Sequence, residues 1–373
     1  MVDESMDKEQ MAKPPQPWEF RSKKAWQRLL IMMGGIIVNV LLAFFIYAMV
    51  LFVWGEKKLP MSSFENGLIV NDSFAYEIGF KDGDKIIAAD GKPVVYYNDL
   101  MAQVLLAREV SIIRDGKPET IHFPEDLLGT LSSRNKLNPL FSIPFPAIID
   151  SIIPGSGAQR GGLLQNDKFV SINAVPTSNM KAVRAQIKAN IGGTIDVIVL
   201  RNNIEVPLKI AVSDSGSIGF NPAAPASIND LDRFGYKLEV YKYGFFESFP
   251  AGVAMTGDKL SMYIQQFKKI INPSTGAYKG IGGFASMTKL YDTTWNWEQF
   301  WTMTAFISIM LAFMNFLPIP GLDGGYVMFA LYEMITRRKP NEKFLEIATT
   351  IGLVLLLMLM LYANGMDVVR AFR

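Results

Sequence analysis

The 373-residue sequence has no cysteine, a single histidine and few charged residues. Without cysteine, a disulfide framework and any mechanism that depends on a thiolate are excluded. Only 19% of the residues are charged, and no basic run interleaved with aromatic residues is present, so nucleic acid is not an expected partner. The one histidine, His122, cannot supply two imidazole ligands to a metal. Its neighbours "ETIHFPED" indicate the end of a strand, and we interpret it as structural.

The sequence does contain long apolar runs. Residues 29–54 carry no charge over 26 positions, which is enough helix to cross a hydrocarbon core of ~30 Å. Residues 299–318 and 344–363 are two further predicted transmembrane spans. The first run is too long for a signal peptide, and the mostly polar residues 1–28 precede it, so we interpret these as a cytoplasmic tail.

The distribution of lysine and arginine predicts the orientation of the spans. Basic residues precede the first span and separate the second from the third, and such clusters stay in the cytoplasm. The section from about 55 to 295 and the C-terminus are then predicted to lie outside. Lys57 and Lys58 belong to this outside section, and they weaken the difference in basic charge between the two sides. The two cytoplasmic clusters are Lys13, Arg21, Lys23, Lys24 and Arg28, and Arg337, Arg338, Lys339 and Lys343.

The outside section contains an internal repeat. "AYEIGFKDGDKIIAADGKP" and "AQRGGLLQNDKFVSINAVP" align at a constant offset of 83, which indicates duplicated small domains. Both stretches resemble the middle of a PDZ domain, the first copy (60–135) less closely than the second (140–222). The resemblance implies binding of extended peptides at a sheet edge. The peptide-binding residues stay unknown, and two alternatives stay open: a steric filter, or a mixed α/β sensory domain without a peptide site. The identical pairs are Ala75/Ala158, Gly79/Gly162, Asp84/Asp167, Lys85/Lys168 and Pro93/Pro176.

Residues 243–271 have a helical pattern with apolar residues near one face. This segment is apolar enough to lie along a membrane surface, and an ordinary packed amphipathic helix is an equal alternative. The residues near that face are Phe245, Phe249, Val253, Ile264 and Phe267.

The segment "NFLPIPGLDGG" interrupts the apolar pattern and brings Asp323 to membrane depth. One interpretation is that Asp323 caps the following helix by accepting hydrogen bonds from free N–H groups. The other interpretation is that Asp323 belongs to a functional site, because an ionised carboxylate near the hydrocarbon costs free energy and is usually kept for a function. The glycines at 321, 324 and 325 permit close backbone approach. Asn315 adds a polar group that could hold a ligand or a substrate backbone.

This segment resembles the N-x-x-P-x-P-x-L-D-G signature of the site-2 protease family, which are intramembrane zinc metalloproteases. "FRSKKAWQRLLIMMGGIIVN" is similar to the family's span-entry motif, with Gly34, Gly35 and Asn39 at matching positions and Ile36 in place of the usual proline. Two PDZ copies between these spans indicate the bacterial RseP branch, the regulator-of-sigma-E proteases. The expected fold is therefore a multi-span α-helical membrane protein with two extracytoplasmic α/β PDZ domains inserted between spans.

The resemblance implies roles for individual residues. Asp323 would be the third zinc ligand and Asn315 would help to position the substrate. The other two ligands would be histidines of an H-E-x-x-H helix, whose glutamate is the general base. This sequence contains no such motif. We therefore expect an inactive fragment of a longer protease that holds no zinc by itself, with a natural pseudoprotease as the alternative.

The complete protein would carry out regulated intramembrane proteolysis in the bacterial inner membrane. Its expected partners are membrane lipid and single-span substrates such as anti-sigma factors and signal-peptide remnants, with the PDZ pair as a periplasmic filter. The alternative from another class is a membrane-anchored tandem-PDZ protein that captures peptides without cleaving them.

The charge distribution makes the topology testable. Tags placed at about residues 10 and 338 are expected to react only from the cytoplasm, and a tag at about residue 190 only from outside. Selective labelling of intact and permeabilised cells measures this. A cytoplasmic tag at 190 would contradict both the orientation and the periplasmic filter.

Overall fold

The computed structural model describes residues 16–134, 139–225, 228–288, 295–338 and 340–372, with the side chains of residues 21, 228, 229 and 342 left aside. The chain forms two compact units. Unit 1 combines the chain up to Glu56, the short segment after Glu125 and the chain from Val240 onward. Unit 2 consists of Lys57–Pro124 and Asn138–Glu239. The predicted tail at 1–28 lies largely outside the described residues.

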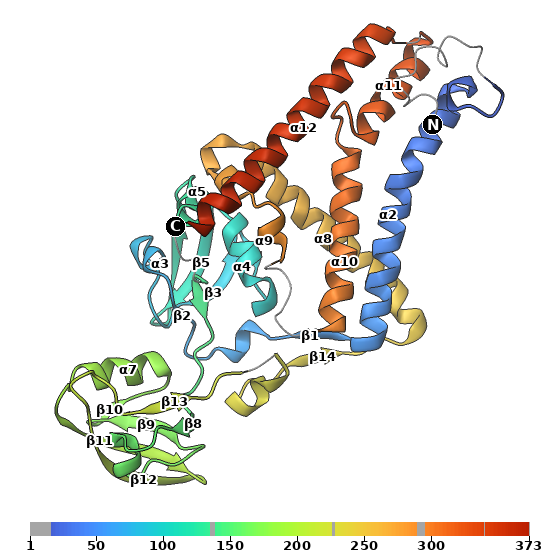
Figure 1. The fold of residues 1–373 in the computed structure, drawn as a ribbon. Coiled ribbons are helices and arrows are strands. Elements are labelled where there is room, and N and C mark those ends of the chain that lie inside the picture. Colours follow the sequence, from blue (N-terminus) through green and yellow to red (C-terminus); the bar gives the residue numbers. More distant parts are fainter. Residues whose placement is uncertain (1–15, 135–138, 226–227, 289–294, 339, 373) are drawn as a thin grey trace. The chain divides into compact units, whose positions relative to one another are not determined.

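Unit 1 is helical, and three of its described helices are long and apolar enough to cross a membrane (Figure 1). They correspond to the three predicted spans, but α10 ends before the predicted limit at residue 318, and α12 is considerably longer than residues 344–363. These helices are α2 (Ala25–Trp54), α10 (Trp297–Phe316) and α12 (Glu342–Ala371). The other helices of the unit are α5 (Leu127–Ser132), α8 (Phe245–Ile271), α9 (Phe284–Thr288) and α11 (Asp323–Thr336), with 3₁₀ turns η2 (Phe20–Ser22), η5 (Pro273–Thr275) and η6 (Ala277–Gly280).

Helix α2 is the centre of unit 1 and packs against α8, α10 and α11. Tyr47 on α2 and Ala305 on α10 are fully buried in the shared apolar cluster. Ser308 on α10 donates a hydrogen bond of 2.8 Å to the backbone carbonyl of Asn39 on α2. Small residues and such polar contacts are the usual means of joining helices in lipid, where no hydrophobic driving force separates helix from helix.

Helix α8 packs through small residues and through part of the predicted apolar stripe, since Phe249 contacts Phe44 of α2 and Phe267 contacts Phe313 of α10. Its buried face is Ser248, Gly252 and Thr256, which recur at every fourth position. A Cβ at residue 252 would lie 2.9 Å from the Cβ of Ala48 on α2, so only glycine permits this approach. Phe245 and Val253 are left exposed, which is the pattern of a helix whose aromatic face meets lipid or a membrane surface.

The short helix α5 belongs to unit 1 although it lies, in sequence, between the two repeats. Gly129 of α5 meets Gly276, which joins η5 to η6, with so little room that a Cβ at residue 129 would lie 2.8 Å from the Cα of Gly276. Gly276 also has φ of +63°, a conformation that favours glycine. This backbone-to-backbone contact fixes the segment between the repeats onto the helical unit.

Unit 2 contains two copies of one arrangement. Each copy has a four-stranded antiparallel sheet, a two-stranded sheet and two helices, with sheet orders β4-β3-β5-β6 and β2-β7 in the first copy, and β10-β9-β11-β12 and β13-β8 in the second. The first copy has β2 (Ile69–Val70), α3 (Ser73–Glu77), β3 (Lys85–Ala89), β4 (Lys92–Pro93), α4 (Tyr97–Leu106), β5 (Glu109–Arg114), β6 (Lys117–His122) and β7 (Phe141–Ser142). The second has β8 (Ile149–Ile152), α6 (Gly157–Arg160), β9 (Lys168–Ile172), β10 (Val175–Pro176), α7 (Met180–Lys188), β11 (Thr194–Arg201), β12 (Ile204–Ala211) and β13 (Phe220–Pro222). The shorter elements are β1 (Glu56–Lys58), η3 (Met61–Ser63), η4 (Ile228–Phe234) and β14 (Glu239–Tyr241).

The first copy extends beyond its predicted end at residue 135. Its last strand, β7, pairs with β2 through Ile69 and Ser142, so the boundary between the copies falls later. The link from β6 to β7 is much longer than the equivalent link from β12 to β13, because it includes α5. This insertion lies beyond the aligned stretches and separates the first copy from its last strand.

The aspartate shared by both copies is a buried structural group. Asp167 accepts hydrogen bonds from Nε and from a terminal nitrogen of Arg201, at 2.8 and 2.7 Å, and from the backbone N–H of Leu164. Asp84 and Arg114 make the same pair in the first copy. The hydrogen bond to Asp167 raises the pKa of Arg201, which keeps the guanidinium charged. The pair joins the turn before β9 to the end of β11.

Removal of this carboxylate is expected to destabilise the second copy. Asp167 is fully buried while Arg201 is about a quarter exposed, so Asp167→Asn is expected to cost about 2–3 kcal/mol in unfolding free energy. All six tryptophans belong to unit 1, so their fluorescence would miss the effect. Hydrogen–deuterium exchange of β9 and β11 measures it directly. The matched control is Asp196→Asn, whose partner Lys209 is exposed, and a change under about 0.5 kcal/mol is expected there. Equal effects of the two substitutions would refute the structural role of the buried pair.

Candidate functional site

The turn between α10 and α11 is held by glycines that face carbonyl groups. A Cβ at residue 324 would lie 2.7 Å from the carbonyl oxygen of Asn315, and one at residue 325 would lie 2.6 Å from that of Ile319. Gly352 of α12 lies directly against the carbonyl of Pro320 from the other side. Gly321 has φ of +97°, which only glycine adopts without strain. The break in the apolar helix is thus enclosed by protein, as a break at membrane depth requires.

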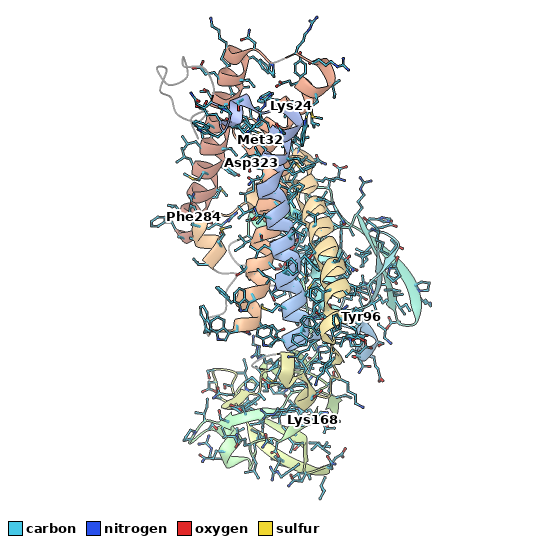
Figure 2. The ribbon with its side chains drawn as sticks, turned by 90° about the vertical axis from the view of Figure 1, so that its right-hand side faces the viewer. Lys24, Met32, Tyr96, Lys168, Phe284 and Asp323 are labelled. Atoms are coloured by element: carbon cyan, nitrogen blue, oxygen red, sulfur yellow. The ribbon has the colours of Figure 1, made fainter. Side chains whose placement is uncertain are left out.

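Asp323 is the first residue of α11, and its carboxylate faces α2. The residue in the cap position is Leu322, and no side-chain capping hydrogen bond is made there. Within the described residues, the carboxylate has no hydrogen-bond or ion-pair partner. Its Oδ2 atom lies 3.7 Å from the point where a Cβ of Gly35 would be, and Figure 2 shows Asp323 near the level of Met32 on α2. The carboxylate is therefore half-buried between two helices and does not cap α11.

Asn315 lies on the other side of the turn, in the last turn of α10. Its backbone carbonyl contacts Gly324, as described above, and its side chain is half-buried. The structure thus brings Asn315 and Asp323 to the two ends of one turn. No hydrogen bond joins their side chains in the described part of the chain, so the substrate-positioning role of Asn315 stays a prediction.

A second candidate site is a groove in the second repeat. It has a volume of about 250 Å³ and lies between α7 and β13. Gly216, Ser217 and Ile218 close one end, and Gly219 follows with φ of +86°. A side chain at residue 219 would collide with Ser156, whose hydroxyl donates a hydrogen bond of 3.0 Å to the carbonyl of Gly219. The remaining lining residues are Met180, Arg184, Ile187, Lys188, Phe220 and Pro222.

The edge of β13 that borders the groove presents backbone groups with which no described strand pairs. The carbonyl of Gly219 accepts a hydrogen bond from the N–H of Ile153, so this carbonyl points toward β8. Backbone direction alternates along a strand, so the N–H and carbonyl of Phe220 point the other way, toward α7. β13 pairs with β8 alone among the described strands. The sequence analysis identified the repeat but not this groove, because the glycine-rich loop "SGSIGF" lies well beyond the segment that repeats.

Comparison with known proteins bears on the turn around Asp323. Residues 2–359 match peptidase family M50, the site-2 proteases, and this range includes the turn around Asp323. The chain belongs to peptidase family M50. A Campylobacter jejuni protein named as a zinc metalloprotease is 32% identical over 69% of this chain and 75% of its own length. Metalloprotease MmpA of Caulobacter vibrioides is 26% identical over 94% of this chain and 70% of its own length. The regulator of sigma-E protease RseP of Escherichia coli is 24% identical over 91% of this chain and 78% of its own length.

The recognition of the site-2 protease family and of its RseP branch is therefore confirmed. Family membership and three apolar helices make this M50 chain a bacterial membrane protein of the zinc metalloprotease type. The ligand role of Asp323 is not tested by these similarities and stays a prediction.

The described residues of this M50 chain do not bring the ligands of a zinc site together. Zinc in proteins takes four ligands, and catalytic sites keep three from the protein. Asp323 offers one carboxylate. His122 ends strand β6 in unit 2, where its Nδ1 lies 3.2 Å from Glu109 and its side chain is three-quarters exposed. In the described ranges, no group of three His, Asp or Glu side chains could hold a metal ion.

An ion pair that sequence reasoning missed also joins α2 to α11. A terminal nitrogen of Arg28 lies 2.5 Å from Oε2 of Glu333, and both side chains are largely buried. The signal in the sequence was a lone glutamate within the apolar stretch "GGYVMFALYEMITRR". The pair fixes the far end of α11 against α2, and so helps to fix the direction in which α11 presents Asp323.

The glycine contact behind the turn is open to test. Gly352→Ala is expected to displace Pro320 and to destabilise unit 1 by about 1–3 kcal/mol, because the added methyl group meets backbone that cannot move aside cheaply. The thermal midpoint of the protein in detergent, followed by tryptophan fluorescence, measures this. Gly365→Ala on the same helix is the matched control, since nothing lies within 4 Å of its Cβ position. An unchanged midpoint for Gly352→Ala would contradict the enclosed turn.

Proposed function

We propose that this chain is part of a membrane-embedded zinc metalloprotease that cleaves single-span membrane proteins within the bilayer. The observation that carries the proposal is the carboxylate of Asp323, which is half-buried, has no partner among the described residues and faces Gly35 of α2. A carboxylate that neither caps its helix nor forms an ion pair has no structural reason to be at membrane depth. An M50 chain would use it as one metal ligand.

The histidine ligands and the general base would come from an H-E-x-x-H helix that this sequence does not contain. Alone, the chain is expected to hold zinc weakly and to cleave nothing. What it contributes is the third ligand on the rigid turn between α10 and α11, the Asn315 side chain beside the same turn, and the outer repeats. We propose that these repeats are periplasmic PDZ domains that select which peptides approach, with anti-sigma factors and signal-peptide remnants as the substrate class.

A second candidate function is peptide capture without cleavage. The groove between α7 and β13, with its glycine-rich loop and its free strand edge, favours it, and such a function needs no metal. A membrane-anchored tandem-PDZ protein of this kind would keep the groove and be indifferent to Asp323. The two candidates therefore differ in what a change at Asp323 does.

The deciding experiment joins the chain to an M50 span that carries H-E-x-x-H and follows cleavage of a single-span test substrate in membranes. Asp323→Asn keeps the size of the side chain but removes the anionic oxygen that a zinc ligand needs. Cleavage and bound zinc are expected to fall by about 100-fold or more, while insertion and thermal stability stay unchanged.

Two controls make this result specific. Asp258→Asn changes an exposed carboxylate on α8 and is expected to leave cleavage intact. The chain without the added span gives the background level of cleavage and of bound zinc. Full cleavage by the Asp323→Asn protein would overturn the ligand role, and stoichiometric zinc in the chain alone would show that it holds ligands other than those named here.

A further inference from the structure

Two unpaired cations lie along one side of the groove in the second repeat. Of the nine described residues that line it, Arg184 and Lys188 are basic and none is acidic. Both side chains are exposed, and neither has a hydrogen-bond or ion-pair partner within the described residues. The other cation of α7, Lys181, is engaged, with its Nζ 2.5 Å from Oδ2 of Asp82. The helix therefore presents unneutralised positive charge to the groove.

The cations share a helix face with the apolar lining. Met180, Arg184, Ile187 and Lys188 are spaced by four, three and one, which places them on one face of α7. Ile187 is buried, whereas Arg184, one turn earlier on the helix, is exposed. The groove wall thus changes from apolar to cationic within one helical turn.

The closed end of the groove suits a peptide carboxylate. No partner is made by the N–H of Ile218 in the described part of the chain, and the N–H of Phe220 points into the groove. The side chain of Ile191, just after α7, lies 3.3 Å from the Cβ position of Gly216, so this loop is at the C-terminal end of α7. A peptide that adds to β13 with its terminal carboxylate at the loop would run back toward the start of α7.

Helix and strand dimensions then fix which peptide residue meets which side chain. Every second residue of the bound strand points to α7, at intervals of about 6.7 Å. Along α7, Arg184 is about 4.5 Å before Ile187 and Met180 is about 10.5 Å before it. With the last peptide side chain set against the buried Ile187, the third-last would lie between Arg184 and Met180, within reach of the guanidinium.

We propose that Arg184 sets the selectivity of this groove: among the C-terminal peptides that a PDZ-like groove binds, it selects those whose third-last residue is acidic. The inference rests on the proposed peptide-binding role of the second repeat and adds its specificity. Arg184 would make a charge-assisted hydrogen bond to that carboxylate. Lys188 would lie closer to the terminal carboxylate and act on all ligands alike.

The test uses the full chain in detergent and fluorescein-labelled peptides that end in Glu-Ala-Val, Gln-Ala-Val or Lys-Ala-Val. Fluorescence polarisation is expected to give a Kd about five- to tenfold lower for the Glu peptide than for the Gln peptide, because the new ion pair is partly exposed. Amidation of the C-terminus is expected to weaken every peptide. The Glu-to-Gln difference is expected to shrink at high salt.

Variants of α7 assign the effect to one residue. Arg184→Gln is expected to make the Glu and Gln peptides equal, and Arg184→Glu is expected to turn the preference toward the Lys peptide. Arg160→Gln is the matched control, because Arg160 is an exposed arginine on α6 that does not line the groove. Exchange rates of β9 and β11 in each variant show whether the repeat is still folded.

The outcomes distinguish failure of the assigned specificity from failure of peptide binding itself. If no peptide with a free C-terminus binds the folded chain, peptide binding by the second repeat is wrong and the inference falls with it. If peptides bind but the Glu and Gln forms are equal, or if Arg184→Gln keeps the difference, only the assigned specificity is wrong. A preference that follows the charge at residue 184 supports both.

Discussion

Direct contact between glycine backbone and carbonyl groups is the constraint on which the membrane unit depends. A chain that breaks a helix at membrane depth must shield the exposed peptide groups, since lipid cannot bond to them. Gly324 and Gly325 do this from within the turn, and Gly352 does it from α12. None of the three contacts tolerates a side chain, so the position of Asp323 is set by backbone geometry rather than by rotamers. A carboxylate presented in this way does not have to be held by hydrogen bonds, which leaves its oxygens available.

The same device recurs where other elements meet. Gly252 brings α8 against α2, and Gly129 meets Gly276 where α5 docks. Unit 2 contains glycine contacts of the same kind, where Gly67 meets the carbonyl of Gly83 and Gly157 meets that of Ala211. It adds, in each repeat, an ion pair between a buried aspartate and an arginine.

Sequence reasoning predicted the spans, the repeat and the turn, because each leaves a local pattern. Apolar length reveals α2, α10 and α12, and the offset of 83 reveals the equivalent Asp84 and Asp167. The family of the chain followed from the motif around Asp323. The capping alternative for Asp323 could be judged only in three dimensions, since any aspartate beside a turn fits that pattern. The groove was missed for a different reason: its walls come from α7 and β13, and only folding brings them together.

The placement of α5 affects how the chain connects the two units. In sequence, the chain leaves unit 1 after Glu56, returns to it at Glu125, leaves again and returns at Val240. The first repeat is completed only after the return at Glu125, because its strand β7 follows α5 and pairs with β2. Unit 2 is therefore joined to unit 1 by four chain crossings rather than two. A body tethered at several points explores less volume than one tethered at a single point, so the local concentration of its binding surface rises accordingly.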